Sequence, residues 1–397
     1  MYTRATYSKY SVGIIQLMYF LLYAAFAAWS SYFYVFLENE RHLTGVQIGS
    51  IAAVQQINNI IFLPLWGMIS DKYGKRKVFL LLLGISVFTL FGFLAQGGFI
   101  YYLVFIVFFS ALHNPIGSLI DSFALRKANE PLVQTTYGKM RLWASVGWAV
   151  SSVGTGYLIK YTTISYIFPI ASTILAITWI ISFFLLNKKR ETTHDIKPGF
   201  KTLYSFLIHN KQLLWFFLFI MLYYIFNSPT LMFINLYYNE IGASNSHIGL
   251  AFAVQSVFEL PFMFFGYKII AKYGIRNIIL FTMFVAAVRM VLYGLTSNPW
   301  VAIAIGCTHG ITLGLFLIAA IEYTQRLVPT SFKSTGQTLF YTFLGLGTSV
   351  GNILNGYLKD FMSLQHAMKL NAAMVLLLII ITICTRKKYK ILNRFSY

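Results

Sequence analysis

Charged side chains are scarce in this sequence, and acidic ones are the scarcest. Asp, Glu, Lys and Arg together make up 11% of the 397 residues, whereas hydrophobic residues make up 58%. A soluble protein of this size needs far more polar surface to cover its core. Nearly uncharged stretches of about 18 residues or more recur along the whole length, as is typical of membrane-spanning helices. The composition therefore predicts an all-α integral membrane protein.

Cysteine is also scarce, and the motifs of several protein classes are missing. The two cysteines, Cys307 and Cys384, exclude a disulfide scaffold and offer no metal cluster. The sequence contains no H-E-x-x-H zinc motif, no G-x-x-x-x-G-K-[S/T] phosphate loop and no sizeable aqueous domain. We therefore expect no metal and no cofactor. A membrane-embedded enzyme is kept only as a disfavoured alternative.

Twelve hydrophobic segments have the length of a membrane-spanning helix. The N-terminus has no small-residue cleavage site, so we expect the first segment to be retained. The expected spans are 11–37, 46–69, 78–97, 100–125, 138–159, 164–187, 213–237, 246–267, 277–297, 300–325, 336–358 and 366–385. The stretch 188–212 is polar and basic, and it predicts a cytoplasmic linker between two six-helix halves, 1–187 and 213–397.

The chain contains an internal repeat displaced by 200 residues. Aligning 22–80 with 222–280 without a gap gives 18 identities in 59 positions, where composition alone gives about 5. The displacement maps the first expected span onto the seventh. Because six is an even number, both halves run in the same direction through the membrane. Two such halves are typical of carriers that expose a central site to each side in turn.

Basic residues greatly outnumber acidic ones and give a net charge of +20. With the N-terminus in the cytoplasm, 25 of the 31 Lys and Arg fall in inner loops and tails. Because positively charged loops resist translocation, this asymmetry predicts that both termini are cytoplasmic. The basic residues that give the net charge then face anionic lipid at the cytoplasmic surface of the membrane, and no nucleic-acid partner is expected.

The loop after the second expected span carries a motif. Residues 67–77, G-M-I-S-D-K-Y-G-K-R-K, resemble the motif G-x-x-x-D-[R/K]-x-G-[R/K]-[R/K] of the major facilitator superfamily at every specified position. The resemblance implies that Asp71 pairs with the other half and latches one conformation, although the loop could simply anchor the topology. Ala271 replaces the acid in the second copy, so any latch is one-sided. The latch residues are Gly67, Asp71, Lys72, Gly74, Lys75 and Arg76.

Few ionisable groups lie within the expected spans, where a charge costs at least about 2.5–3.5 kcal/mol. Each half holds one acid and one arginine, and two histidines accompany them. These groups are Asp121, Arg141, Glu259, Arg289, His113 and His309. They either form ion pairs that hold helices together or line a solute site. The second reading is favoured because buried ion pairs stabilise a fold poorly compared with apolar packing.

Helical spacing brings some of these groups together. Arg141 and Trp148 are seven residues apart, which places them on one helix face and about 10 Å apart along the axis. A guanidinium beside an indole ring suits either a sugar or an aromatic carboxylate. Packing is the alternative role for Trp148. Gln255 and Glu259 likewise share one face of the eighth expected span.

Several segments resemble a narrower family. Residues 137–149, Y-G-K-M-R-L-W-A-S-V-G-W-A, are similar to the fifth span of lactose permease and the related oligosaccharide–proton symporters. Segments 258–265, 287–289 and 308–310 follow the order of that family's spans eight to ten. Residues 64–67 are similar to the phenylpropionate-permease and nucleoside-symporter branch.

The resemblance implies roles for individual residues. It implies substrate contacts for Asp121, Arg141, Trp148, Glu259 and His309. It further implies that Glu259 links substrate recognition to proton transfer, that His309 takes part, and that Arg289 stabilises the deprotonated acid.

Thr312 marks a departure from that family. The sugar symporters carry protons on a glutamate at this place, one turn after the histidine of span ten. Glu259 is then the best remaining proton carrier, because burial disfavours the charged form of a carboxyl group and a nearby arginine favours it. Uniport and coupling through Asp121 are alternatives.

These features together predict a secondary active transporter of the plasma membrane, monomeric and working by alternating access. We expect proton-coupled uptake of a small solute, either an oligosaccharide, a nucleoside or an aryl-carboxylate. A proton-driven exporter of drugs or metabolites is the alternative.

Overall fold

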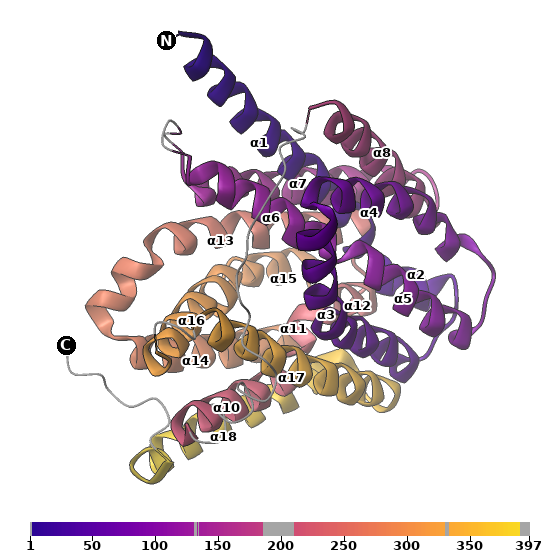
Figure 1. The fold of residues 1–397 in the computed structure, drawn as a ribbon. Coiled ribbons are helices and arrows are strands. Elements are labelled where there is room, and N and C mark those ends of the chain that lie inside the picture. Colours follow the sequence, from indigo (N-terminus) through magenta and orange to yellow (C-terminus); the bar gives the residue numbers. More distant parts are fainter. Residues whose placement is uncertain (1, 131–132, 134, 186–209, 330–332, 390–397) are drawn as a thin grey trace. The chain divides into compact units, whose positions relative to one another are not determined.

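A computed structural model describes residues 2–130, 133, 135–185, 210–329 and 333–389 of the chain. The described residues form helices joined by short connections, with no β-strand among them (Figure 1). The expected all-α class is therefore confirmed. Most of the expected linker 188–212 lies outside the described residues, which begin again at 210.

Helices of the first part of the chain end before the linker. They are α1 (Tyr2–Ser30), α2 (Phe33–Asn39), α3 (Gly45–Tyr73), α4 (Lys75–Thr89), the 3-10 helix η1 (Leu90–Leu94), α5 (Phe99–His113), α6 (Pro115–Ala128), α7 (Tyr137–Leu158), the 3-10 helix η2 (Ile164–Tyr166) and α8 (Ile167–Leu185).

Helices of the second part begin after the linker. They are α10 (Lys211–Asn227), α11 (Pro229–Met232), α12 (Ile234–Glu240), α13 (Asn245–Tyr273), α14 (Ile275–Leu295), α15 (Pro299–Gly306), the π-helix η3 (Gly310–Leu315), α16 (Phe316–Leu327), α17 (Lys333–Phe361) and α18 (Leu364–Tyr389).

Each of the twelve expected spans contains helix within the described residues, and nine helical segments of the described residues are long and apolar enough to cross a membrane. The other three expected spans contain α7, α10 and α17. Helix α10 is apolar but has only 17 residues. Helices α7 and α17 are long enough but contain many Gly, Ser and Thr residues, which lower their hydropathy.

The repeat of the sequence recurs in the helix boundaries. Helix α3 begins at residue 45 and ends at 73, and α13 begins at 245 and ends at 273. A single residue then turns the chain into the next helix, α4 or α14. That residue is Gly74 with φ of 95° or Gly274 with φ of 81°, a backbone region in which glycine has no steric cost. The two sequence copies therefore form the same local structure.

One compact unit gathers residues within 1–43, 58–193 and 242–257. In this first unit, α1 packs against α7 and α8, and α4 packs against α8. Gly147 of α7 permits the close approach of α1, because a Cβ atom there would collide with the backbone carbonyl oxygen of Phe20. The helices of this unit carry Asp121 and Arg141.

The second unit gathers residues within 44–57, 194–241 and 258–397. Here α10 packs against α17, and α14 packs against α18. Gly347 of α17 has the same role as its counterpart 200 residues earlier, since a Cβ atom there would collide with the carbonyl oxygen of Met221. This unit carries Glu259, Arg289 and His309.

The compact units and the expected sequence halves differ at two helices. The first part of α3 groups with the second unit, and the first part of α13 groups with the first unit. The boundaries 1–187 and 213–397, drawn from the sequence repeat and the linker, stay a prediction.

Asp360 of α17 caps the N-terminus of α3 in the second unit. Its carboxylate accepts hydrogen bonds from the backbone amides of Gly45 at 2.5 Å and Val46 at 2.9 Å. A negative charge that satisfies unpaired amides at a helix start stabilises the helix. The equivalent position of the first repeat is Lys160, so this cap has no sequence counterpart.

Replacing Asp360 with alanine is expected to lower the midpoint of thermal unfolding by about 2–4 °C, the equivalent of a lost helix cap worth about 1 kcal/mol. Unfolding of the purified protein in detergent measures the effect. Lys160→Ala, at the equivalent repeat position, is the matched control and should leave the midpoint unchanged. Equal midpoints for the two variants would contradict the capping role.

Candidate functional site

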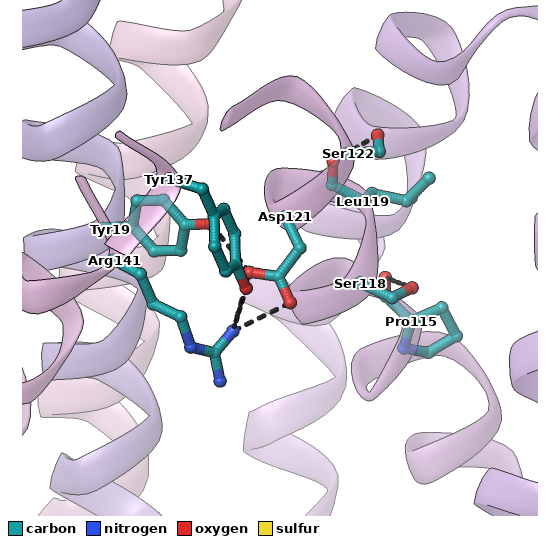
Figure 2. A network of polar contacts seen from close by, with 8 residues as sticks. All are labelled: Tyr19, Pro115, Ser118, Leu119, Asp121, Ser122, Tyr137 and Arg141. Carbon is teal, nitrogen blue, oxygen red and sulfur yellow. Dashed lines mark hydrogen bonds and ion pairs between the residues drawn. The ribbon is translucent and has the colours of Figure 1, made fainter. Parts of the chain in front are cut away.

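The acid and the arginine of the first unit form an ion pair. Asp121 lies on α6 and Arg141 on α7, and Nη1 of Arg141 donates to Oδ1 and Oδ2 of Asp121 at 2.7 and 2.8 Å. The Arg141 side chain is 37% exposed and that of Asp121 is 26% exposed, so neither is fully enclosed by protein. Figure 2 shows the carboxylate facing the guanidinium. The local charge balance considered for this half is thus present.

Two helix starts position these side chains. Helix α6 begins with Pro115, which fits a first-turn position because no intrahelical amide hydrogen bond is needed there. Helix α7 begins after Thr136, whose hydroxyl accepts a hydrogen bond from the backbone amide of Lys139 at 3.3 Å. Arg141 then lies just over one turn into α7, on the same face as Tyr137.

Two tyrosines complete the cluster, and sequence reasoning missed both. The hydroxyl of Tyr19, a fully buried residue of α1, donates to Oδ1 of Asp121 at 2.7 Å. The hydroxyl of Tyr137 accepts from Nη1 of Arg141 at 3.0 Å. The four-residue spacing of Tyr137 and Arg141 could have predicted their contact, because residues four apart are neighbours on a helix face. Tyr19 is 102 residues from Asp121, so no spacing in the sequence predicted that contact.

One edge of the guanidinium faces away from Asp121. The hydrogen bonds from Arg141 to Asp121 and Tyr137 all start at Nη1. In Figure 2 the other terminal nitrogen points away from Asp121. The ring of Tyr23 lies beside the group, with its centroid 5.9 Å from Cζ of Arg141. The pair is therefore neutral as a whole, and neither Asp121 nor Tyr137 uses Nε or Nη2.

Two other predicted residues of the first unit lie apart from this pair. Trp148 is half-buried and lies two turns further along α7, where its backbone carbonyl oxygen accepts from the Ser152 hydroxyl. His113 is buried against the rings of Phe26, Trp29 and Phe109, at centroid distances of 4.5, 5.5 and 4.6 Å. Such surroundings indicate a packing role for His113.

Arg289 of α14 is the centre of a second polar cluster, in the second unit. It is 1% exposed. Its Nη1 lies 3.0 Å from Nδ1 of His309 and donates to Oγ1 of Thr312 at 3.0 Å, and its Nη2 donates to the Tyr293 hydroxyl at 3.4 Å. The structure thus joins two of the three predicted proton-coupling residues and adds Thr312 and Tyr293.

Glu259, the third predicted coupling residue, lies on α13 and is half-buried. Its Cγ atom would be 3.2 Å from a Cβ atom placed on Gly314 of η3. Arg289 meets η3 at Thr312 instead, so the two charged residues approach this π-helix at different positions. Sequence reasoning missed the π-helix, a feature that is frequent at functional sites.

The residues of the loop motif occupy the end of α3 and the start of α4. Asp71 and Lys72 are exposed, and Gly74 makes the turn between the helices. The side chain of Arg76 donates to the carbonyl oxygen of Phe183 on α8 at 2.6 Å. Gly67 lies about two turns before the end of α3 and Lys75 begins α4. The latch itself stays a prediction.

In the described chain, no group of three or more His, Cys, Asp and Glu side chains is placed to hold a metal.

Comparisons with known proteins give a consistent result. The chain matches the family described as "MFS_1 like family" over residues 13–370. It is 29% identical to the maltose permease of Geobacillus stearothermophilus over 357 residues, 87% of each chain. It is 24% identical to the sucrose permease of Escherichia coli over 356 residues, 84% of this chain and 83% of that protein. The crystal structure of the nucleoside transporter NupG has a similar fold, with a TM-score of 0.83, 17% identity, and coverage of 95% of this chain and 99% of NupG.

Proposed function

Because the chain belongs to the MFS_1 like family, we propose that it is a secondary active transporter that takes up a small neutral solute together with protons. The predicted superfamily, its relation to sugar permeases and nucleoside transporters, the multi-pass membrane location and the exclusion of an enzyme are confirmed by this membership and by the relatives. The proposal adds twelve spans, cytoplasmic termini, alternating access by the two halves and a monomeric protein.

The ion pair of Asp121 and Arg141 carries the proposal for the solute. Its charges cancel, so an anionic solute gains little Coulomb attraction there. A hydroxylated neutral solute, by contrast, can accept from the edge of Arg141 that faces away from Asp121 and donate to a carboxylate oxygen. These properties favour a sugar or a nucleoside over an aryl-carboxylate. Maltose and sucrose permeases among the relatives are in keeping with a sugar.

We assign proton coupling to Glu259, with His309 and Arg289. Glu259 is the acid of the second unit within the α13 span, where a carboxyl group can exchange its proton as its surroundings change. Thr312 occupies the place at which sugar symporters carry a glutamate, and a hydroxyl group cannot titrate in this range. Arg289 and His309 belong to the same unit and are already in contact. The exposed Asp71 is the proposed one-sided latch.

Uptake into proteoliposomes tests this function. With an imposed inside-alkaline gradient, we expect radiolabelled maltose, sucrose or uridine to accumulate, and a protonophore to abolish the accumulation. An aryl-carboxylate such as phenylpropionate should neither accumulate nor compete. Accumulation only under the opposite gradient would favour the exporter. Transport of the aryl-carboxylate alone would contradict the argument from the neutral ion pair.

A further inference from the structure

The start of α3 and the later part of α17 form a close contact inside the second unit, although the two helices come from different halves of the sequence repeat. A Cβ atom on Gly49 of α3 would collide with the backbone carbonyl oxygen of Asn352. A Cβ atom on Gly356 of α17 would likewise collide with that of Gly45. The two backbones therefore touch without intervening side chains. With the cytoplasmic termini proposed above, this contact lies at the outer side of the membrane.

Asp360 stabilises the contact. Its carboxylate is carried by α17 and accepts hydrogen bonds from the backbone amides of Gly45 and Val46 at the start of α3. These charge-assisted bonds exist only while the two helices touch. Separation of the helices would lose both, so Asp360 favours the closed contact.

Asn352 acts in the opposite direction. It shares one face of α17 with Ser349 and Gly356, which lie three residues before it and four after it. On this face the Ser349 hydroxyl donates to the backbone carbonyl oxygen of Ala53 on α3 at 3.2 Å. The Asn352 side chain is 0% exposed, and neither its amide nitrogen nor its amide oxygen has a hydrogen-bond partner among the described residues. A buried amide without a partner is costly, and separation of the helices would remove that cost.

The repeat counterpart of this contact lacks both features. In the first unit, α7 meets the start of α13, where a Cβ atom on Gly249 would collide with the carbonyl oxygen of Ser152. Ser152 lies 200 residues before the unpaired asparagine, and its hydroxyl donates to the carbonyl oxygen of Trp148 at 2.7 Å. Lys160 lies 200 residues before the capping carboxylate. The two opposing groups are thus specific to the contact of α3 with α17, and close helix packing alone does not require them.

We propose that the contact of α3 with α17 is an outer gate, held closed by Asp360 and biased towards opening by the unpaired amide of Asn352. This inference rests on the alternating access of the proposed function. A gate needs two states of similar free energy, because a state that is far more stable than the other is never left. The buried amide keeps the closed state from becoming too stable.

Hydrogen–deuterium exchange of the purified full-length protein in detergent tests the gate without solute. In Asn352→Ser, which has the side chain of the other repeat, we expect the peptide that covers 44–49 to exchange roughly tenfold more slowly, because a hydroxyl can donate within its own helix. In Asp360→Asn we expect roughly tenfold faster exchange, because the amide has no charge and its N–H groups cannot accept. If Asn352→Ser does not fold, Asn352→Ala, which also removes the amide, takes its place.

The peptide that covers 244–249 distinguishes a gate from a local helix cap. Alternating access opens both outer contacts together, so this peptide should change in the same direction as 44–49 in each variant. Lys160→Ala is the matched control and should leave both peptides unchanged. A change confined to 44–49, or equal exchange in all the proteins, would overturn the proposal.

The exchange measurement uses neither solute nor a proton gradient, so its failure can be told from that of the uptake assay. Linked changes in both peptides without uptake would refute the solute assignment alone. Normal uptake with changes confined to 44–49 would refute the gate alone.

Discussion

Replacing Arg141 with lysine is expected to reduce solute uptake by roughly 100-fold, which corresponds to about 3 kcal/mol of lost binding. The ammonium group of lysine can still pair with Asp121 and keeps the net charge of the cluster. It lacks, however, the second edge with Nε and Nη2, which Asp121 does not use. Initial rates of uptake at several solute concentrations measure the effect, and most of the loss should appear in KM.

The control for this substitution is a second arginine in an ion pair. Nε of Arg326 donates to the Glu322 carboxylate at 3.0 Å, and the two residues lie one turn apart on α16. Arg326→Lys should leave uptake unchanged. Tyr19→Phe provides a further comparison, because it removes the hydrogen bond to Asp121 but leaves Arg141 in place. Full uptake by Arg141→Lys would show that the Nε and Nη2 edge of the guanidinium does not bind the solute.

The ion pair was predictable from the sequence because few charges lie in the spans. Within the six expected spans of the first half, Asp121 is the one acid and Arg141 the one arginine, and the cost of burial brings them together. Tyrosine is different, since the chain has 27 of them and most can pack without a polar role. Nothing in the sequence distinguishes Tyr19 from the rest, and its contact with Asp121 depends on how α1 packs.

The repeat predicted helix boundaries better than hydropathy did. The boundaries of α3 and α13 agree at both ends, because the turn after each helix depends on one glycine that both copies keep. The mean hydropathy of α7 and α17 is too low to identify them as spans, because both contain small and polar residues that permit close helix packing. The mean hydropathy of a sequence window cannot distinguish a membrane-spanning helix with polar residues at its packing surface from a helix outside the membrane.

The surroundings of Arg289 could be predicted only in part. His309 and Arg289 were both expected in the coupling site, and they are in contact. The π-helix η3 was not expected, and it determines which side chains of residues 310–315 meet α13 and α14. The wider turn of a π-helix changes the direction in which the following side chains point, and no local sequence pattern predicts it. The contact between Arg289 and Thr312 depends on this geometry.

Replacing Glu259 with glutamine is expected to abolish solute accumulation while leaving exchange of solute across the membrane largely intact. Glutamine has nearly the shape of glutamate and keeps hydrogen-bonding groups, but it cannot bind and release a proton. A gradient of about one pH unit stores about 1.4 kcal/mol for each proton, enough for roughly tenfold accumulation. The variant should therefore reach equal concentrations inside and outside, whereas the wild type should approach the tenfold value.

Two assays on the same proteoliposomes separate coupling from binding. Counterflow of labelled solute without a gradient should proceed in Glu259→Gln at a rate within a few-fold of the wild type, since it requires binding and alternating access only. Glu322→Gln is the control for removing an acid from a neighbouring helix, because Glu322 pairs with Arg326 and has no assigned role in coupling. Accumulation in this control should match the wild type. If Glu259→Gln accumulates solute tenfold under the gradient, the proton passes through another group, and Asp121 is then the acid to test.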